Sequence, residues 1–404
     1  MTVNYLAFAI PAFFIFVFIE YQIAQQRKRD KIFKYESSIA NFSVGIAERL
    51  LNLFIAASFY QVYEWVYSHY ALFQIPNKWY VWLLLLLATD FVWYWYHRLG
   101  HEINFLWAAH IVHHQSEEFN FTAAARITTI QAIFRNVFWC VLPLIGFQPH
   151  MIITILLVHG AYSFFTHTQL IGKLGWLEYV LITPSLHGVH HASDEKYLDK
   201  NYGDVFVFWD KLFGTFQQEE EPPKYGLTHT IKSYSFLWQH FHYYLEIAEA
   251  YRRADGPKAK WNALFGSPAL MDQNIRPALE VRYFQNKEKT QSGSKFKKYL
   301  NIQLVMVVIT LTATTMFYSF LSAIDRWAIL ILVLITLINI GALLEQRIWI
   351  YYLEAFRLIL LFAYLFYVLQ IFKWVIFPIV LLVLLERTYS LRKLYNKYIL
   401  SFKG

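Results

Sequence analysis

The sequence predicts an all-α, multi-pass membrane protein with a histidine-rich cap on one side of the membrane and four further transmembrane helices near its C-terminus. Hydrophobic residues make up 57% of the 404 residues and charged residues only 16%, which is too little charge for an ordinary solvated surface. Apolar stretches close to the length of a membrane span recur along the chain. Most histidines gather where such stretches end.

The predicted membrane spans divide the chain into four parts. Residues 4–22, 40–67 and 79–96 are each apolar enough to cross, and "QIPNK" at 74–78 is a turn. Residues 131–166 are interrupted by Pro143, Gly146 and Pro149, which favours a hairpin that returns to the same side. We therefore predict N-terminal membrane helices (1–96), a histidine-bearing catalytic part (97–216), a cytosolic segment (217–300) and C-terminal helices (301–404) with spans at about 301–323, 327–344, 350–371 and 373–386.

The net charge of +8 indicates basic loops beside membrane spans rather than a nucleic-acid-binding surface. Basic residues stand beside the first and last spans, and Lys and Arg in short flanking loops mark the cytoplasmic side. No nucleic-acid-binding motif accompanies them, so we expect no nucleic acid as a partner. These residues are Arg27, Lys28, Arg29, Lys31 and Lys34, then Arg387, Arg392, Lys393, Lys397 and Lys403.

The first span has no basic leader and no Ala-x-Ala cleavage site, so we expect it to be a retained helix. Cys140 is the one cysteine of the chain. It excludes an intramolecular disulfide and a thiolate metal cluster, and its apolar neighbours favour a buried structural thiol.

Histidine spacing predicts a metal site. Eleven of the fifteen histidines lie between positions 97 and 191, and eight of them form an HxxxH and two HxxHH patterns. Residues three and four apart share one face of a helix, so each pattern presents its imidazoles together. Eight ligands exceed the needs of one ion and predict two metals close together. The eight are His97 and His101, His110, His113 and His114, and His187, His190 and His191.

The remaining histidines divide into one candidate ligand and six structural residues. His167 ends a span in "FFTHTQL" on the side where the others collect, so it is a candidate ninth ligand. His159, inside an apolar helix, is expected to be a packed or hydrogen-bonded residue. The same holds for His69, His150, His229, His240 and His242, which have no partner at ligand spacing.

Imidazole ligands without sulfur suit iron, zinc, copper or nickel rather than magnesium or calcium. Oxygen chemistry would select iron, and a dizinc hydrolase is the alternative. Polar groups should orient the imidazoles. The candidates are Asp90, Glu102, Asp194 and Asn201, together with Glu117, Glu118 and Asp204.

The order of the three histidine patterns resembles the fatty acid hydroxylase and sterol desaturase superfamily of membrane diiron enzymes. The stretches that carry it are "WYWYHRLGHEINFLWAAHIVHHQSEEFNFTAAAR", "TPSLHGVHHASDEKYLDK" and "NYGDVFVFWDKLFGTF". The hydrophobic C-terminal helices are similar to those of its ether-lipid branch. Leu186 departs from the pattern, because the family would place another histidine there.

The resemblance implies a diiron oxidoreductase, a monooxygenase that uses dioxygen. In the ether-lipid branch it would hydroxylate the carbon next to the ether bond of alkylglycerols and release a fatty aldehyde. It also implies tetrahydrobiopterin as the electron donor, and Glu102 stands where a carboxylate is linked to activity. The centre would face the cytoplasm, at the inner membrane of a bacterium or the endoplasmic reticulum of a eukaryote.

Two other readings stay open at this point. A sterol, carotenoid or fatty-acyl hydroxylase or desaturase would share the same metal site, with a redox protein in place of the pterin. A metal transporter or sensor is a rival from another class, although its ligands would lie near mid-membrane rather than at span ends. The sequence leaves the oligomeric state open.

Overall fold

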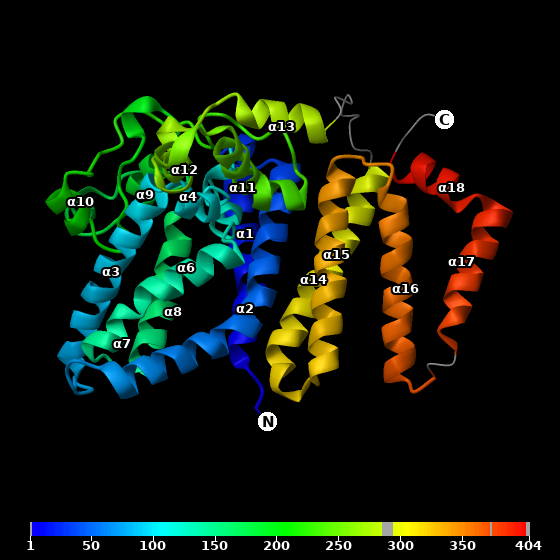
Figure 1. Cartoon of the computed structure of the whole chain (residues 1–404), viewed down its shortest axis with the longest axis horizontal. Helices are drawn as coiled ribbons and strands as arrows, with labels where there is room; N and C mark the ends of the chain where they lie inside the picture. Colours follow the sequence, from blue (N-terminus) through cyan, green and yellow to red (C-terminus); the bar gives the residue numbers. More distant parts are fainter. Residues whose placement is uncertain (1, 285–293, 372–373, 401–404) are drawn as a thin grey trace. The chain divides into compact units, whose positions relative to one another are not determined.

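The computed structural model of the chain is helical, as the sequence predicts. It describes residues 2–284, 294–371 and 374–400, and 73% of these residues are in helices. The described residues contain no strand, only two isolated bridges, Leu181 with Phe206 and Ala192 with Tyr225. Figure 1 traces the helices in chain order.

Within the described residues, six helical segments are long and apolar enough to cross a membrane, so this is an integral membrane protein. They are Tyr5–Gln26, Asp30–Tyr70, Pro149–Thr166, Phe296–Phe320, Ala323–Leu344 and Ile350–Val368. The helix α3 (Trp79–Glu102) is 24 residues long but is not among the six, because its Trp and Tyr residues lower its hydropathy. The helix α17 (Ile376–Tyr389) has 14 residues and is shorter than a typical span; position 373, where the sequence predicted its start, lies outside the described residues.

The chain forms two compact units. The histidine unit comprises residues 14–232 and 239–284, and the C-terminal unit comprises residues 2–13, 233–238 and the described residues from 294 onward. The histidine unit contains most of α1 (Ala9–Gln26), then α2 (Tyr35–Tyr70), α3, α4 (Asn104–His110), α5 (Phe121–Ala124), α6 (Thr129–Trp139), α7 (Val141–Ile145), α8 (Pro149–Thr166), α9 (Pro184–His190), α10 (Phe208–Phe213), α11 (Phe236–Arg253), α12 (Gly256–Phe265) and α13 (Ile275–Tyr283).

The predicted hairpin over 131–166 is built from α6, α7 and α8. It turns at Gly146, whose φ of 124° is open mainly to glycine. A Cβ there would lie 2.0 Å from the carbonyl oxygen of Phe73. The turn therefore requires glycine, and Pro149 then starts α8 at a position where proline is favoured.

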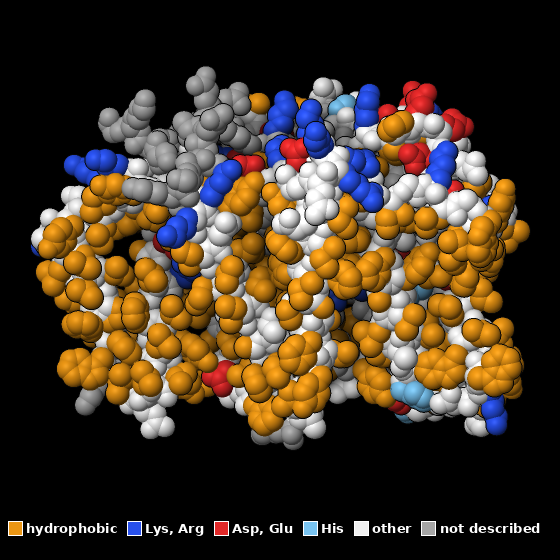
Figure 2. Space-filling view, turned by 180° about the vertical axis from the view of Figure 1, so that it is seen from behind, with side chains coloured by type: hydrophobic (Ala, Val, Ile, Leu, Met, Phe, Trp, Pro, Cys, Tyr) orange, Lys and Arg blue, Asp and Glu red, His pale blue; other side chains and the backbone are white. Residues whose placement is uncertain are grey.

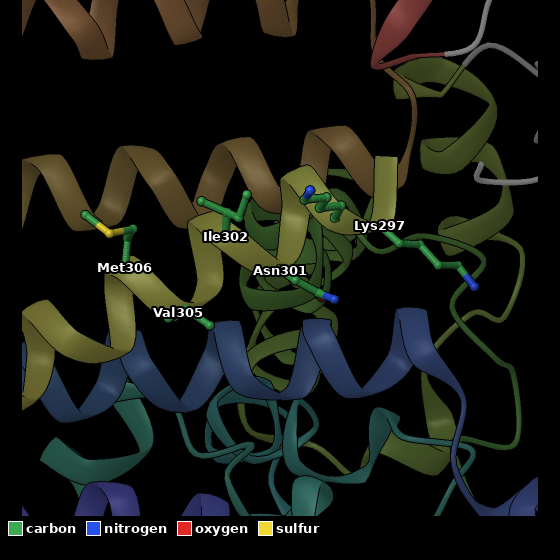
Figure 3. A pocket seen from close by; sticks show the side chains of 6 residues that line it. Lys297, Asn301, Ile302, Val305 and Met306 are labelled. Carbon is green, nitrogen blue, oxygen red and sulfur yellow. The ribbon is translucent and has the colours of Figure 1, made fainter. Parts of the chain in front are cut away.

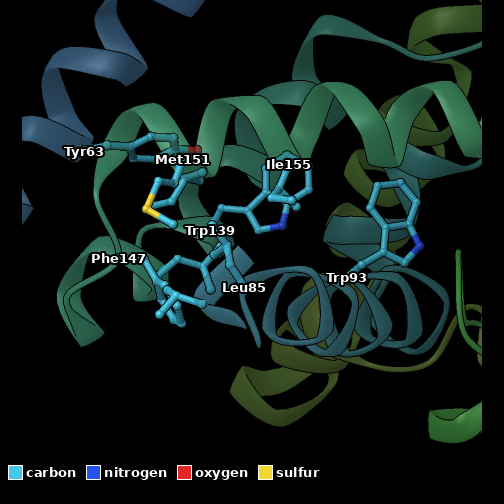
Figure 4. Close-up of a cluster of buried hydrophobic side chains, with 10 residues drawn as sticks. Tyr63, Leu85, Trp93, Trp139, Phe147, Met151 and Ile155 are labelled. Atoms are coloured by element: carbon cyan, nitrogen blue, oxygen red, sulfur yellow. The ribbon is translucent and has the colours of Figure 1, made fainter. Parts of the chain in front are cut away.

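A cluster of buried apolar side chains holds α3 against α2, α6, α7 and α8 (Figure 4). Leu85 and Met151 are fully buried in it, and Trp93 of α3 and Trp139 of α6 also belong to it. Arg135 lies over both indoles, 5.0 Å from the ring of Trp139 and 5.9 Å from that of Trp93. The cluster fixes the angle at which α3 delivers the histidines at its C-terminal end.

Several helices of the histidine unit meet at one end. The C-terminal part of α3 lies there with α4, α9, α11 and α12 (Figure 1). Over each unit, hydrophobic side chains cover most of the visible face, and Lys and Arg gather mostly at the end drawn at the top (Figure 2). In the histidine unit this is the end that carries α4 and α9.

The C-terminal unit contains α14 (Ser294–Phe317), α15 (Ala323–Leu344), α16 (Ile350–Val368), α17 and α18 (Leu391–Tyr398). The carboxylate of Glu354 is buried between these helices, where it accepts hydrogen bonds from Tyr299 and Gln303 at 2.8 Å each and pairs with Arg357 at 2.5 Å. Buried charge inside a helix bundle is stable only when it is paired in this way. A hollow runs along α14, lined by Lys297, Lys298, Asn301, Ile302, Val305 and Met306 (Figure 3).

We predict that Leu85→Ala lowers the free energy of unfolding in detergent by about 2–5 kcal/mol, because it leaves a cavity in a closely packed cluster. Leu83→Ala is the matched control on the same helix, since 56% of that side chain is exposed, and it should cost less than about 0.5 kcal/mol. Equal losses in the two variants would contradict the packing described here.

Candidate metal centre

Nine histidines meet in two neighbouring groups at the end of the histidine unit. The five-histidine group is His97, His101, His110, His114 and His190; the four-histidine group is His113, His167, His187 and His191. In each group one nitrogen from every ring lies within 4.8 Å of the others. The eight histidines of the three patterns and the candidate ninth ligand, His167, are therefore all brought together.

Local structure explains how so short a stretch serves two groups. His97 and His101 project from one face of α3, and His110 is the last residue of α4. The chain then tightens into a 3-10 turn over His113–Gln115, so that His113 and His114 diverge. His113 enters the four-histidine group and His114 the five-histidine group. The HxxHH pattern of α9 also divides: His187 and His191 lie in the four-histidine group and His190 in the five-histidine group. Each HxxHH pattern therefore contributes to both groups.

In both groups, neighbouring ring nitrogens lie about 3 Å apart, which is the separation of a hydrogen bond or of two ligands of one ion. In the five-histidine group, Nε2 of His110 lies 3.0 Å from Nε2 of His97 and 3.2 Å from that of His114. In the four-histidine group, Nε2 of His167 lies 3.2 Å from that of His113 and 3.1 Å from that of His187. Two imidazole nitrogens bound to one ion at about 2.1 Å lie about 3.0–3.4 Å apart. The spacing therefore fits nitrogens that face a shared ion.

Burial keeps these imidazoles neutral, the form that binds metal. It lowers the pKa of His190 and of His167 to about 4. Burial, followed by the neighbouring imidazoles, holds the pKa of His110, His114 and His187 well below the usual range. An imidazolium here would have no compensating water, so the neutral ring is strongly favoured.

In three of the nine rings Nδ1 donates to a main-chain carbonyl, which turns Nε2 inward. Nδ1 of His97 donates to the carbonyl of Tyr202 at 2.8 Å, and Nδ1 of His190 donates to that of Lys200 at 2.9 Å. Nδ1 of His167 donates to the carbonyl of Ser163 at 2.8 Å. A hydrogen bond at Nδ1 fixes the tautomer that leaves Nε2 free to bind a metal.

A fourth imidazole, that of His110, is contacted at Nδ1 by a side chain instead of a main-chain carbonyl. The amide of Gln131 lies 2.9 Å from Nδ1 of His110, and among the described residues its oxygen has no hydrogen-bond partner. Turned by 180°, that oxygen would accept the Nδ1 proton, and the nitrogen and oxygen of an amide are interchangeable in such an assignment.

The two carbonyls that hold His97 and His190 belong to one kinked segment, residues 199–206. Asp199 and Asn201 have φ values of 58° and 53°, in the left-handed region that Asp and Asn tolerate better than most residues. The carboxylate of Asp210 accepts hydrogen bonds from the main-chain N–H of Tyr202 at 2.7 Å and of Gly203 at 2.8 Å. This arrangement turns the carbonyls of Lys200 and Tyr202 toward the five-histidine group.

The polar residues predicted to orient the imidazoles occupy different places. Asn201 is fully buried; its amide donates to the carbonyls of Leu186 and Gln217. Glu102 pairs with Arg98 at 2.8 Å, with 46% of its side chain exposed, and Asp194 accepts from the main-chain N–H of Lys224. Neither carboxylate bonds to a histidine of the two groups.

Asp90 also bonds to no histidine of the two groups. It contacts His159, which lies outside both groups, at 3.0 Å. His159 is thus hydrogen-bonded, as the sequence indicates. The carboxylate of Asp90 further accepts from the main-chain N–H of Val205 and of Phe206, at 2.9 and 3.0 Å.

Three positions that support the site were not identified from the sequence. Gln131 and Tyr202 act through an amide and a main-chain carbonyl, and neither gives a signal in a histidine pattern. Asp210 lies inside the quoted stretch "NYGDVFVFWDKLFGTF", and a buried carboxylate close to two glycines was the one available hint.

Arg126 supports the turn that carries His113 and His114. The guanidinium is buried and donates to the carbonyl of Val112 at 2.7 Å, to Asn41 at 2.8 Å and to the side chain of Gln115. No carboxylate among the described residues pairs with it directly, and burial lowers its pKa to about 9. The cation is stabilised by carbonyl and amide oxygens and ties α2 to the turn.

Fold and site together define an integral membrane protein with two buried groups of histidines whose arrangement is compatible with a metal site. The fatty acid hydroxylase family model matches residues 82–215, a range that contains all nine histidines. Relatives match most of the chain, and the chain belongs to the fatty acid hydroxylase family. Its members named below are oxygen-dependent oxidoreductases, so this chain is an enzyme.

The relatives include an alkylglycerol monooxygenase from Homo sapiens, 31% identical over 352 residues, which are 85% of this chain and 78% of that protein. One from Danio rerio is 28% identical over 89% of this chain and 81% of its own. The ornithine lipid hydroxylase OlsE of Rhizobium tropici is 31% identical over 39% of this chain and 47% of its own. No solved structure matches this chain.

We predict that Asn201→Ala lowers the melting temperature more than Asn201→Gly. Both variants lose the hydrogen bonds to Leu186 and Gln217, but alanine also bears a left-handed φ that costs about 1–2 kcal/mol. Thermal unfolding of the purified protein in detergent measures the difference. Equal melting temperatures would show that the positive φ carries no cost at this position.

Proposed function

We propose that the chain is a membrane diiron monooxygenase that hydroxylates the carbon next to the ether bond of an alkylglycerol. The observation that carries the proposal is the pair of histidine groups, five and four imidazoles with Nε2 atoms about 3 Å apart. The names of the relatives that match most of the chain support the substrate class.

The donor set favours iron among the metals that imidazole binds. Nine neutral nitrogens without a carboxylate or thiolate are a poor site for magnesium or calcium. Zinc would fit the nitrogens but has no redox chemistry, whereas the family consists of oxidoreductases. When bound, a pair of irons supplies the redox chemistry that activates dioxygen.

The reaction balances with two electrons and two protons from a donor. One atom of dioxygen enters the C–H bond beside the ether oxygen and the other leaves as water. The resulting hemiacetal breaks its C–O bond, and its hydroxyl proton passes to the glycerol oxygen, which leaves a fatty aldehyde and a glycerol derivative.

Apolar rings surround the nitrogens and exclude water. Trp107 lies 4.7 Å from the ring of His101 and 5.5 Å from that of His114, and Phe119 lies 5.1 Å from the ring of His191. On the membrane side, Trp93 joins the buried apolar cluster to His97, with ring centres 5.7 Å apart. We expect Trp93, Trp95, Tyr96, Phe105 and Trp107 to guide the alkyl chain, since apolar and aromatic side chains line most lipid sites.

The polar reductant would arrive from the opposite, aqueous side. His101 is the one member of the two groups that is not fully buried, and its Nδ1 lies 3.9 Å from the exposed carboxylate of Asp199. Nearby on α3, Glu102 is exposed and Arg98 is partly exposed. We propose this edge as the side that meets tetrahydrobiopterin or an electron-transfer protein.

We further propose that the metal centre faces the cytoplasm, at the inner membrane of a bacterium or the endoplasmic reticulum of a eukaryote. The basic segment 27–34 contacts the loop that follows His167: Arg27 donates to the carbonyl of Leu170 at 3.0 Å, and Arg29 to that of Gln169 at 2.9 Å. Segments rich in Lys and Arg beside a span stay in the cytoplasm.

Loss of a ligand should remove metal and activity together. We expect His190→Ala and His187→Ala each to lower the iron content of the purified protein from about two ions toward one and to abolish turnover, because each removes one donor from a different group. His150→Ala is the control, since His150 is exposed and belongs to neither group. Two retained irons and full turnover in the two variants would refute the ligand assignment.

A product assay should identify the substrate. With iron-loaded protein, dioxygen and tetrahydrobiopterin, we expect aldehyde from an alkylglycerol but none from the ester analogue. A parallel panel with a ferredoxin or NADPH system, and with sterol, fatty-acyl and ornithine lipids, tests the related hydroxylases and desaturases. Hydroxylated or unsaturated lipid without aldehyde would favour one of these and reject the ether-lipid assignment.

Labelling of single cysteines should report the side of the membrane. In a Cys140→Ser background, we expect Lys28→Cys to react with an impermeant maleimide only from the cytosolic side, and Asn77→Cys only from the opposite side. Both positions are exposed and lie at opposite ends of α2. The reverse pattern would place the metal centre outside the cytoplasm.

A further inference from the structure

His159 is buried between two carboxylates although it belongs to neither histidine group. Its Nε2 lies 3.0 Å from Oδ1 of Asp90, and its Nδ1 lies 2.7 Å from Oδ2 of Asp204. The exposed fractions of the three side chains are only 2%, 0% and 2%. Such a cluster inside a helix bundle is costly to bury, so its partners are expected to serve a role.

Both carboxylates are connected to segment 199–206, whose carbonyls bind two imidazoles of the five-histidine group. Asp204 is part of that segment, and Asp90 accepts from the main-chain N–H of the next two residues, Val205 and Phe206. Asp90 also accepts from the indole N–H of Trp209 at 3.1 Å. His159 on α8 and Asp90 on α3 therefore fix residues 204–206 to the membrane helices.

The other end of the segment carries the two carbonyls that meet the histidines. Lys200 and Tyr202 accept from Nδ1 of His190 and His97, both members of the five-histidine group. The outward nitrogens of the four-histidine group do not use this segment: Nδ1 of His167 bonds to Ser163, and among the described residues Nδ1 of His113 and of His187 have no partner. Support from the segment is thus directed to one group.

We propose that His159, with Asp90 and Asp204, is a positioning element for the five-histidine group. It fixes segment 199–206, whose carbonyls aim Nε2 of His97 and His190 at the metal. The inference rests on the proposed function only in that the two groups bind metal. Its particular consequence is that disturbance of the triad weakens one metal site and leaves the other intact.

The test is a metal titration of the full-length apoprotein in detergent, with Co²⁺ followed by its visible absorption. We expect His159→Phe to raise the dissociation constant of the five-histidine site about 10–100-fold, the usual effect of losing a group that orients a ligand. The four-histidine site should change less than about twofold. His150→Phe, the same substitution on the same helix, should leave both sites unchanged.

Combining His159→Phe with a second substitution, in one or the other histidine group, shows which metal site is weakened. In His187→Ala, which leaves the five-histidine group intact, His159→Phe should still weaken binding. In His190→Ala, which leaves the four-histidine group intact, it should have no effect. Equal weakening in both backgrounds, or in neither, would overturn the proposal.

Asp204→Asn keeps the volume of the side chain. It tests the positioning role even if the His159→Phe variant does not fold. It should weaken the five-histidine site selectively, and a folded Asp204→Asn protein that binds both ions as the wild type does would reject the positioning role. Failure of the proposed function has a different signature, because His187→Ala and His190→Ala would then leave metal binding unchanged.

Discussion

The structure depends on one costly arrangement: nine uncharged imidazoles held in a water-free space with their Nε2 atoms turned toward two points. Rings so close together cannot all satisfy one another with hydrogen bonds, because each neutral imidazole has a single N–H, and those of His97, His167 and His190 are used on outward carbonyls. The arrangement is tolerable when the inward nitrogens face cations. Much of the histidine unit serves to hold these rings in place, from the apolar cluster under α3 to the kinked segment 199–206.

Support for the rings comes mainly from the main chain. Carbonyl oxygens of Ser163, Lys200 and Tyr202 fix three of the nine rings. The segment that carries the last two carbonyls is in turn held by buried carboxylates, Asp90 and Asp210. A carboxylate that accepts two adjacent N–H groups shapes a loop without entering the site itself. This explains why carboxylates can be essential to a site that contains imidazole as its only ligand type.

The position of the site at the end of the membrane helices matches the chemistry of an enzyme that joins an oily substrate to polar reagents. Trp93 connects the nitrogens to the apolar cluster, while His101 reaches the edge beside Asp199. In the proposed reaction, one buried centre would therefore meet an alkyl chain from the bilayer and a reductant from water. The C-terminal unit, with its own buried Glu354 network, contributes no histidine to either group.

The sequence by itself determined the helical membrane class, because a helix is a local structure whose apolar length is written in consecutive residues. The prediction that each histidine pattern presents its imidazoles together holds for His97 and His101 on α3. It is wrong for the two HxxHH patterns, each of which divides between the two groups. The sequence could not decide that His113 and His114 separate into different groups, that the break of the hairpin falls at Gly146 against Phe73, or that Asp90 contacts His159 rather than one of the nine. Only the tertiary structure decided these points, because each depends on contacts between residues far apart in the chain, and such contacts follow from the packing of helices rather than from the period of any one of them.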